Sequence, residues 1–343
     1  MTTFNFSWFP WKKFTPIFIA VILLAACAVN ASPALPAIQP PLEATAEQSK
    51  PAPTSTSSRL AATNPPEKST PSSTKDNQSE VITSTMLPSP PVGQPEVTDW
   101  QEMPIFPASI SPRAVEIYLN GIAAGNDPTR FSKVGDCQNI TTYFLAMFDK
   151  PGQYTLGEKF APLQETIDYY AGSWSRESKA VKGGFNAASV FNPVFSDRSV
   201  CEKSESPIAC ELRVYKPSIV LISMEEWWNG DVVKYETYMR KIIETVIANG
   251  SLPVLATKAD NLEGDHKINQ VIFNLAQEYE LPLWNFWAAV QPITAKGLQK
   301  DGFHLTHGLN DFSSSIQLKR GWVQRNLTAL QTLDAIRKLL PTP

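Results

Sequence analysis

The second part of the sequence predicts an α/β fold built around a parallel sheet. Short apolar runs alternate there with longer segments in which apolar residues recur at helical spacing. The runs typical of buried strands are Phe131–Val134, Ser218–Met224, Pro253–Thr257 and Leu283–Phe286. The segments with helical periodicity are Arg113–Ala123, Leu163–Ala171, Lys234–Asn249, His266–Tyr279 and Gln324–Leu339. Buried strands that alternate with amphipathic helices favour a parallel sheet covered by helices.

The charge balance excludes two broad classes of protein. The chain has 343 residues, with 30 Lys and Arg against 33 Asp and Glu, and a formal net charge of -3. A nucleic-acid-binding domain would carry an excess of basic residues, so we expect no nucleic-acid partner. The balance also excludes a highly charged disordered chain. Only 3 His are present, and we expect neither a metal site nor a cofactor.

The first 30 residues are typical of an export signal. Lys12 and Lys13 precede an apolar run, Ile17–Ala26, which is shorter than the roughly 20 residues of a membrane span. The run leads into Leu24-Ala25-Ala26-Cys27, which resembles the lipobox of bacterial lipoproteins. That resemblance implies removal of residues 1–26 and lipidation of Cys27, which would hold an exported, extracytoplasmic protein at the cell membrane. The alternative is an ordinary secretory signal with an incidental cysteine.

Residues 27–104 differ in composition from the rest of the chain. Residues 31–100 contain 13 Pro, 11 Ser and 9 Thr, and Trp100 is their only aromatic residue. Such a segment buries too little apolar surface to offset the loss of chain entropy, so we expect a disordered tether. The folded domain is then residues 105–343, about 240 residues, which suffices for one sizeable core. We expect this domain to be a monomer.

Two of the three cysteines in this domain lie close together in the sequence. Cys201 and Cys210 bracket CEKSESPIAC, which reads as a polar loop, and in an exported protein such a pair most simply forms a disulfide. No His lies near them in the sequence, which argues against a metal site. Cys137 is left over. It is either a buried structural residue or a reactive thiol.

Two motifs at opposite ends of the domain carry groups suited to nucleophilic catalysis. Val134-Gly135-Asp136-Cys137 follows the first predicted strand, and ligands of open α/β sheets bind beyond the carboxyl ends of the strands. A helix beginning near Cys137 would lower the pKa of its thiol. Asp301 precedes His304 by three residues, so it can orient the ring while His304 accepts a proton from a nucleophile. A solvated Asp–His pair is the alternative reading, and His307 is a competing base.

Together these motifs resemble the first and last blocks of the SGNH (GDSL) hydrolases, with Cys137 in place of the nucleophilic serine. Gly184-Phe185-Asn186-Ala187-Ala188-Ser189 resembles the second block, with Ala188 at the position of its glycine. The resemblance covers residues 130–307 and implies a three-layer, flavodoxin-like fold. It also implies that Cys137 is the nucleophile, His304 the base and Asp301 its orienting carboxylate. The backbone N–H groups of Cys137 and Ala188 would hold the oxyanion, with Asn186 beside them.

The third block departs from the family. The family has Gly-x-Asn-Asp after a central strand, whereas here the strand leads into Met224-Glu225-Glu226-Trp227-Trp228-Asn229. By register, Trp227 takes the place of the Asn that donates to the oxyanion, and Asn229 replaces it only in a rebuilt loop. Loss of one such donor typically costs about 10²–10³ in rate. Glu225–Trp228 is then either a packed lid or a sugar-binding platform.

The sequence therefore predicts an esterase-like hydrolase that acts on an acyl or acetyl ester of an extracellular glycan or lipid. The alternative is a catalytically inactive module of the same fold that binds a carbohydrate or another surface ligand. The polar loop Thr257–His266 follows the third predicted strand. We expect it on the same edge of the sheet as Cys137.

Overall fold

The computed structural model describes residues 99–224 and 231–342. Its sheet has four strands in the order β1-β2-β3-β4, and every neighbouring pair is parallel. The strands are β1 (Asp127–Gly135), β2 (Pro217–Ser223), β3 (Leu252–Ala256) and β4 (Leu283–Trp284). The predicted α/β class with a parallel sheet is confirmed.

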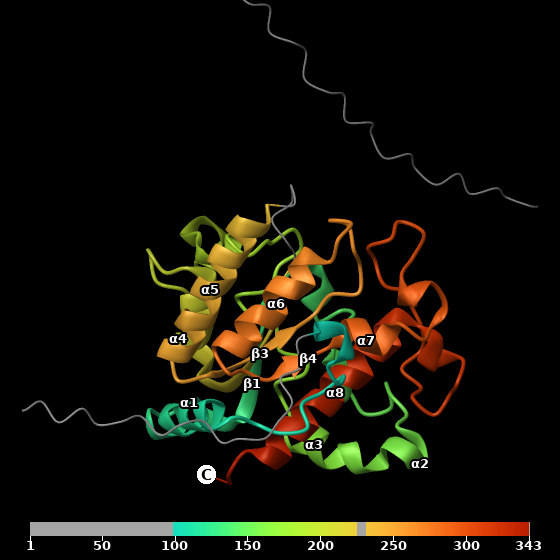
Figure 1. Cartoon of the computed structure of the whole chain (residues 1–343). Coiled ribbons are helices and arrows are strands. Elements are labelled where there is room, and N and C mark those ends of the chain that lie inside the picture. The colour runs from blue at the N-terminus through green and yellow to red at the C-terminus, as the bar shows by residue number, and fades with distance from the viewer. Residues whose placement is uncertain (1–98, 225–230, 343) are drawn as a thin grey trace, which may run out of the picture. The chain divides into compact units, whose positions relative to one another are not determined.

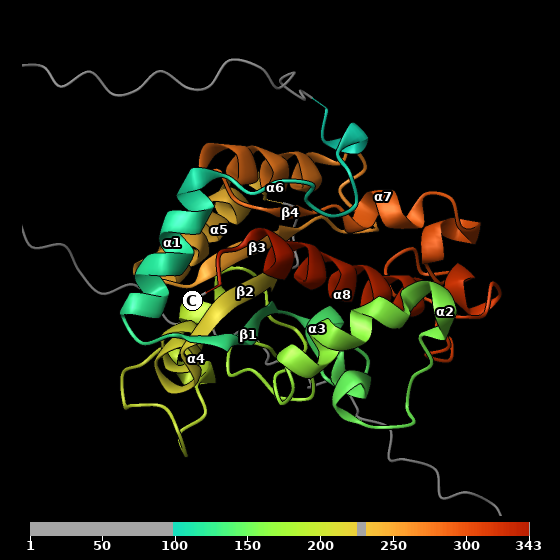
Figure 2. The same cartoon turned by 90° about the horizontal axis from the view of Figure 1, so that it is seen from below.

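Helices cover both faces of this sheet. Figures 1 and 2 show α4, α5 and α6 on one face and α3 and α8 on the other. Successive strands add on the same side, so right-handed crossovers place the connecting helices α4, α5 and α6 on one face. The α-helices of the described residues are α1 (Pro112–Ala123), α2 (Gly157–Phe160), α3 (Gln164–Tyr169), α4 (Pro207–Tyr215), α5 (Val232–Ala248), α6 (Lys267–Glu278), α7 (Phe286–Val290) and α8 (Gly321–Leu339).

The core lies along the two central strands. Each residue of β3 is buried, and so is each residue of β2 except Ser223, as expected for parallel strands packed on both faces. Helix α1 ends against the turn between α5 and β3, where Asn126 Nδ2 donates to Asn249 O at 3.0 Å. The carboxyl ends of the strands therefore remain available for a site at the opposite edge. No helix among the described residues is long and apolar enough to cross a membrane.

Two sequence-based assignments are wrong in detail. The predicted strand Leu283–Phe286 stops at Trp284, because Asn285 Oδ1 accepts from Ala288 N at 3.2 Å and begins α7. The predicted polar loop between Cys201 and Cys210 contains the start of α4. Ser206 Oγ accepts from Ala209 N, and the Pro that follows Ser206 suits the first helical position.

The predicted disulfide between Cys201 and Cys210 is present. Glu205 lies beside the two sulfurs, in a grouping whose atoms could hold a metal. Both cysteines are committed to the disulfide, however, so their thiolates are not available as ligands. The disulfide joins α4 to the segment before it.

Residues 99–104, which the prediction includes in the tether, contact the domain. Trp100 is buried, and its ring lies 4.7 Å from that of Trp287 and 5.6 Å from that of His266, measured between centroids. Asn285 Nδ2 donates to the carbonyl oxygens of Trp100 and Met103. The predicted signal, Cys27 and the rest of the tether lie outside the described residues.

Candidate active site

Cys137 lies in a tight turn at the carboxyl end of β1. The buried Asp136 side chain accepts from Gln138 N at 2.8 Å, and Asp136 O accepts from Asn139 N at 3.0 Å. Cys137–Asn139 is a 3₁₀ helix of three residues, so no α-helix begins at the thiol. Cys137 is partly buried and is not part of a disulfide. The predicted placement beyond a strand end is present, whereas the helix that would lower the thiol pKa is not.

Gly135 allows this turn to close against the next strand. Asn139 Nδ2 donates to Ser223 O at 2.7 Å, which joins the turn to the end of β2. A Cβ added to Gly135 would lie 2.0 Å from Asn139 Nδ2 and 2.5 Å from Ser223 O. Only glycine fits at this position, because any side chain would displace both contacts.

The second block lies on the other side of β1. Gly135 N donates to Ala180 O at 3.1 Å, and Gly135 forms a parallel bridge with Val181. In the turn that follows, Asn186 Oδ1 accepts from Ala188 N at 3.0 Å. The amide predicted to hold an oxyanion is therefore hydrogen-bonded to Asn186 in this structure.

The Asp301–His304 pair is present in the loop before α8. Asp301 Oδ2 lies 2.7 Å from His304 Nδ1, and Asp301 Oδ1 accepts from the backbone N–H groups of Phe303 and His304 at 3.0 Å each. The hydrogen bond to His304, followed by those to the two amides, lowers the pKa of Asp301 to about 2. The pair is open to solvent, with 57% of the His304 side chain exposed. Nδ1 is held by the carboxylate, so Nε2 is the nitrogen left for proton transfer.

His307, the competing base, has a different environment. Its ring centroid lies 5.3 Å from that of Tyr143 and 6.4 Å from that of Trp322. Among the described residues His307 makes no ion pair with a carboxylate, whereas His304 pairs with Asp301. The geometry favours His304 as the oriented imidazole.

A hollow of about 220 Å³ opens next to the Cys137 turn. It is lined by Asn139, Ile140 and Thr141 on one side and by Glu177, Ser178, Val181, Lys182 and Gly183 on the other. A second hollow of about 320 Å³ shares Glu177, Ser178, Val181 and Lys182 with the first. Cys137 and His304 line neither hollow, and the first hollow adjoins the Cys137 turn through Asn139. On this ground the two hollows are the candidate substrate site.

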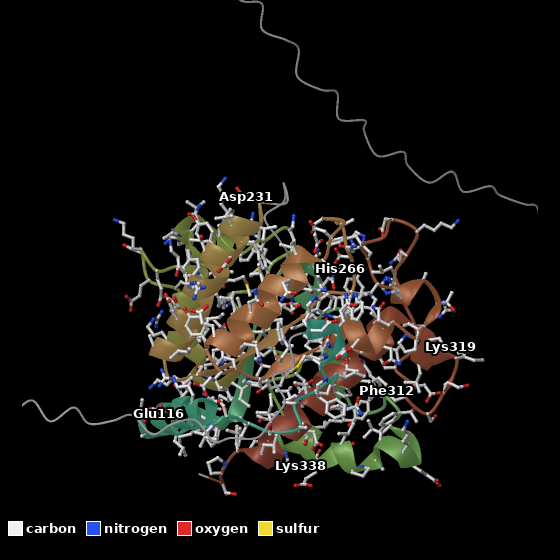
Figure 3. All side chains as sticks on the ribbon, in the orientation of Figure 1. Glu116, Asp231, His266, Phe312, Lys319 and Lys338 are labelled. Carbon is white, nitrogen blue, oxygen red and sulfur yellow. A yellow bond between two sulfur atoms is a disulfide. The ribbon has the colours of Figure 1, made fainter. Side chains whose placement is uncertain are left out.

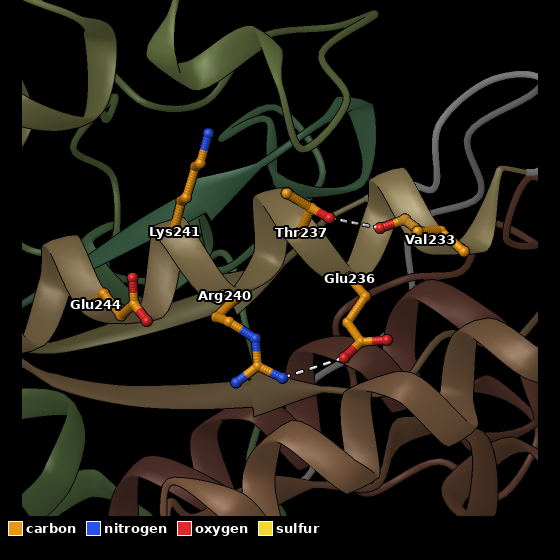
Figure 4. A pocket seen from close by; sticks show the side chains of 6 residues that line it. All are labelled: Val233, Glu236, Thr237, Arg240, Lys241 and Glu244. Carbon is orange, nitrogen blue, oxygen red and sulfur yellow. Dashed lines mark hydrogen bonds and ion pairs between the residues drawn. The ribbon is translucent and has the colours of Figure 1, made fainter. Parts of the chain in front are cut away.

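A larger hollow, of about 360 Å³, lies elsewhere. Figure 4 shows that its six lining residues come from α5 alone, from Val233 to Glu244. Arg240 reaches Glu236 on the same helix and also pairs with Glu278 of α6. This is the charged outer surface of a helix, without a nucleophile or a base.

The altered third block lies outside the described residues. Asn229 and the segment Glu225–Trp228 therefore have no place in the site as described. On either side of them, Tyr235 Oη donates to Met224 O at 3.3 Å, and Asp231 accepts from Lys234 N at the start of α5.

Sequence reasoning missed Arg325, which reaches the Cys137 turn from α8. Its side chain is 1% exposed, although arginine is almost never fully buried unless it is paired. Arg325 Nε donates to Gln138 O at 3.1 Å, and Nη2 donates to Ser223 Oγ at 2.8 Å. In the sequence it is one charged residue near the start of the last predicted helix, Gln324–Leu339, and nothing there singles it out.

A buried charged cluster follows β3, in the loop that was expected near Cys137. Lys258 Nζ donates to Asp260 at 2.8 Å and to Glu263 at 2.7 Å. Burial would lower the pKa of Lys258, but the two carboxylates outweigh burial and raise it above its usual value. Nearby, burial lowers the pKa of His266, whose position is labelled in Figure 3. Lys258, Asp260 and Glu263 therefore form a buried ion-pair network, whereas Leu262, Gly264 and Asp265 of the same loop are exposed.

No family model matches the chain, and no relative is found among curated proteins. Solved structures that are similar to part of it include the following two. The crystal structure of TesA has 17% sequence identity, covers 59% of this chain and 99% of that chain, and has a TM-score of 0.35. A lipolytic protein of the G-D-S-L family from Desulfitobacterium hafniense has 16% identity, covers 60% of this chain and 99% of that chain, and has a TM-score of 0.33. The α/β assignment stands on the strand pairing of this chain.

Proposed function

We propose that the domain is an esterase-like hydrolase that uses Cys137 as its nucleophile and the Asp301–His304 pair as its base. The observation that carries the proposal is the doubly anchored Asp301 carboxylate, which holds His304 Nδ1 and leaves Nε2 for proton transfer. The proposed nucleophile, Cys137, lies at the end of β1, in a turn whose Asn139 lines a hollow.

The reaction follows from these groups. His304 Nε2 takes the thiol proton as sulfur attacks the ester carbonyl carbon. The tetrahedral intermediate collapses, the alcohol leaves with the proton from His304, and an acyl thioester remains on Cys137. Water then attacks the thioester and gives a proton to His304, the acid leaves, and that proton returns to the thiolate. The product pair is one alcohol and one carboxylic acid.

The oxyanion would be held by backbone amides of Cys137 and Ala188. The Ala188 amide donates to Asn186 Oδ1 in this structure, so that bond must lengthen or be shared when substrate binds. This requirement favours slow turnover, because a donor already engaged stabilises the transition state less than a pre-arranged one. It is also the observation that favours the second candidate, a non-catalytic module that binds a glycan in the hollows beside Lys182.

The substrate class we propose is an acyl or acetyl ester on an extracellular glycan or lipid. The sequence supports this location through its export signal and the lipobox-like Cys27, which would anchor a monomer to the membrane from outside. Replacing Cys27 with Ala should release the chain from the membrane fraction or leave an unprocessed precursor. A Cys27→Ala variant that fractionates and migrates like wild type would contradict the anchor.

The test of the hydrolase uses the full chain with p-nitrophenyl acetate. Cys137→Ala and His304→Ala should each lower kcat/KM by about 10³-fold or more, because nucleophile and base act as one unit. His307→Ala is the matched control and should stay within about threefold of wild type. Mass spectrometry of acid-quenched protein should find an acetyl group on Cys137. The binding module would be established instead if wild type cleaved no ester or thioester, and wild type and Cys137→Ala bound polysaccharide with the same affinity.

A further inference from the structure

The side chain of Arg325 connects the Cys137 turn to the end of the neighbouring strand. Its Nε donates to Gln138 O at 3.1 Å, and its Nη2 donates to Ser223 Oγ at 2.8 Å and lies 3.5 Å from Asn139 Oδ1. These atoms belong to the turn after β1 and to the last residue of β2. A single guanidinium from α8 therefore bridges two strand ends, whose bonded residues are 187 and 102 positions away from it in the sequence.

Three aromatic rings fix the guanidinium in place. Its Cζ lies 4.7 Å from the ring centroid of Phe144, 5.1 Å from that of Trp284 and 5.2 Å from that of Phe286. Each of these rings is fully buried. A guanidinium held among aromatic rings is restricted in rotamer and gains cation–π attraction in a desolvated setting.

The contacts at Gln138 determine what Arg325 does to the turn. Asp136 Oδ1 accepts from Gln138 N, which orients the peptide between Cys137 and Gln138. Arg325 donates to Gln138 O, which orients the next peptide. With Gly135 fixed to Ala180 and Ser223 on either side, the backbone around Cys137 is held from four directions.

We propose that Arg325 is a positioning residue for the Cys137 nucleophile. It holds the turn so that the sulfur and the Cys137 backbone N–H keep one orientation. The inference rests on the proposed function, because it assigns the purpose of this clamp to catalysis by Cys137. Arg325 itself does not contact substrate.

The clamp needs the fork of an arginine. Donors on two branches of the guanidinium reach Gln138 O and Ser223 Oγ at the same time. A lysine would keep the charge and much of the aromatic contact, but its ammonium is a single point and lacks this planar fork. Arg325→Lys therefore removes the geometry and retains the charge.

The test compares Arg325→Lys with Arg337→Lys in the full chain. Arg337 is a matched control because it also lies on α8, over the ring of Tyr169, and bonds to Thr166 Oγ1 and Glu165, away from the turn. With p-nitrophenyl acetate, Arg325→Lys should lower kcat by about 10–100-fold and leave KM within about twofold, because misplacement of a reacting group by about 1 Å has effects of this size. Arg337→Lys should retain wild-type kcat.

Hydrogen exchange reads the turn without reference to activity. The amides of Gln138 and Asn139 should exchange about tenfold faster or more in Arg325→Lys and at the wild-type rate in Arg337→Lys. Ser223→Ala removes one of the contacts of Arg325 and keeps the bond to Gln138 O, so it should fall between wild type and Arg325→Lys in both measurements. This milder variant serves if Arg325→Lys does not fold.

The outcomes separate this inference from the proposed function. The positioning role would be overturned, and the hydrolase left intact, if folded Arg325→Lys had the kcat and the exchange rates of wild type. If Arg325→Lys does not fold, the same result in Ser223→Ala would overturn it. Faster exchange in the turn with an unchanged kcat would also overturn it, because the turn would then not govern catalysis. A wild-type protein without ester hydrolysis would remove the proposed function, and the positioning role would fall with it.

Discussion

Asn139 in the Cys137 turn is fully buried and bonded to the end of β2, whereas 57% of the His304 side chain is exposed. The turn is held by partners that are distant in sequence: Ala180, Ser223 and Arg325. The His304 loop is held at its imidazole by Asp301, three residues away. The proposed nucleophile is therefore fixed by tertiary packing, and the proposed base by a local motif.

This difference has a consequence for how the two halves respond to change. A residue in the turn has several neighbours that cannot move independently, because they belong to the sheet and to α8. The loop around His304 is held by near neighbours in the sequence, since Gln299 N donates to His304 O at 2.7 Å, while the side chains of Asp301 and His304 are exposed. The same kind of substitution should therefore destabilise the protein more in the Cys137 turn than in the His304 loop. Such pairs of substitutions test the comparison.

Two glycine-to-alanine substitutions give the largest contrast. In Gly135→Ala the new Cβ would meet Ser223 O at 2.5 Å and Asn139 Nδ2 at 2.0 Å, so the free energy of unfolding should fall by about 3 kcal/mol or more. In Gly302→Ala no atom lies within 4 Å of the new Cβ, and the cost is that of an alanine at a φ of 73°, about 1 kcal/mol. Urea unfolding of the two variants measures both values. Equal losses would remove the distinction between a crowded turn and an open loop.

Lys133 on β1 gives a smaller effect with a distinct pH dependence. Its side chain is 1% exposed, Nζ donates to Trp174 O at 3.1 Å, and burial lowers the pKa from 10.5 to about 8. Between pH 8 and 10.5 the unfolded chain binds more protons at Lys133 than the folded chain. The free energy of unfolding should therefore rise with pH across this window, by an amount on the order of 1–3 kcal/mol.

Lys133→Met should remove this rise and increase stability at pH 7, less the loss of the bond to Trp174 O. Lys300→Met, in the exposed segment just before Asp301, is the matched control for the change in charge. Chemical denaturation at pH 7.5, 9 and 10 distinguishes the variants. If the free energy of unfolding of wild type stayed constant or fell over this range, and that of Lys133→Met did the same, Lys133 would not be a buried cation with a lowered pKa.

The same contrast explains which parts of the molecule could be predicted from sequence. The Asp301–His304 pair is a local motif, and its spacing alone places the carboxylate on the ring nitrogen. The strands could also be predicted, because β2 and β3 are continuous apolar runs. Arg325 could not, since its partners, Gln138 and Ser223, are joined to it only by the folded sheet.

Local signals also account for the errors. Ser206 followed by Pro207 is a helix-start signal, yet the polar stretch before it and the pair of cysteines favoured a loop. Asn285 interrupts an apolar run, and its capping role depends on the helix that follows. In both cases the capping residue indicates where the helix starts, and apolar periodicity does not.

Asp301→Asn should have the smallest effect on stability, and the pH dependence of that effect tests the local motif around His304. The pKa of Asp301 is about 2 in the folded chain, against an ordinary 3.8, chiefly because of the hydrogen bond to His304 and then because of the two backbone amides. A carboxyl whose pKa falls on folding contributes stability that is complete above pH 3.8 and is lost as pH falls through 2. The difference in Tm between wild type and Asp301→Asn should therefore shrink as pH falls from 5 to 2.

His304→Ala should remove the larger part of this pH dependence and leave the part due to the amides of Phe303 and residue 304. Differential scanning calorimetry in this range measures it, and a difference in Tm that does not change with pH would mean that the carboxylate of Asp301 is not held by the loop as described.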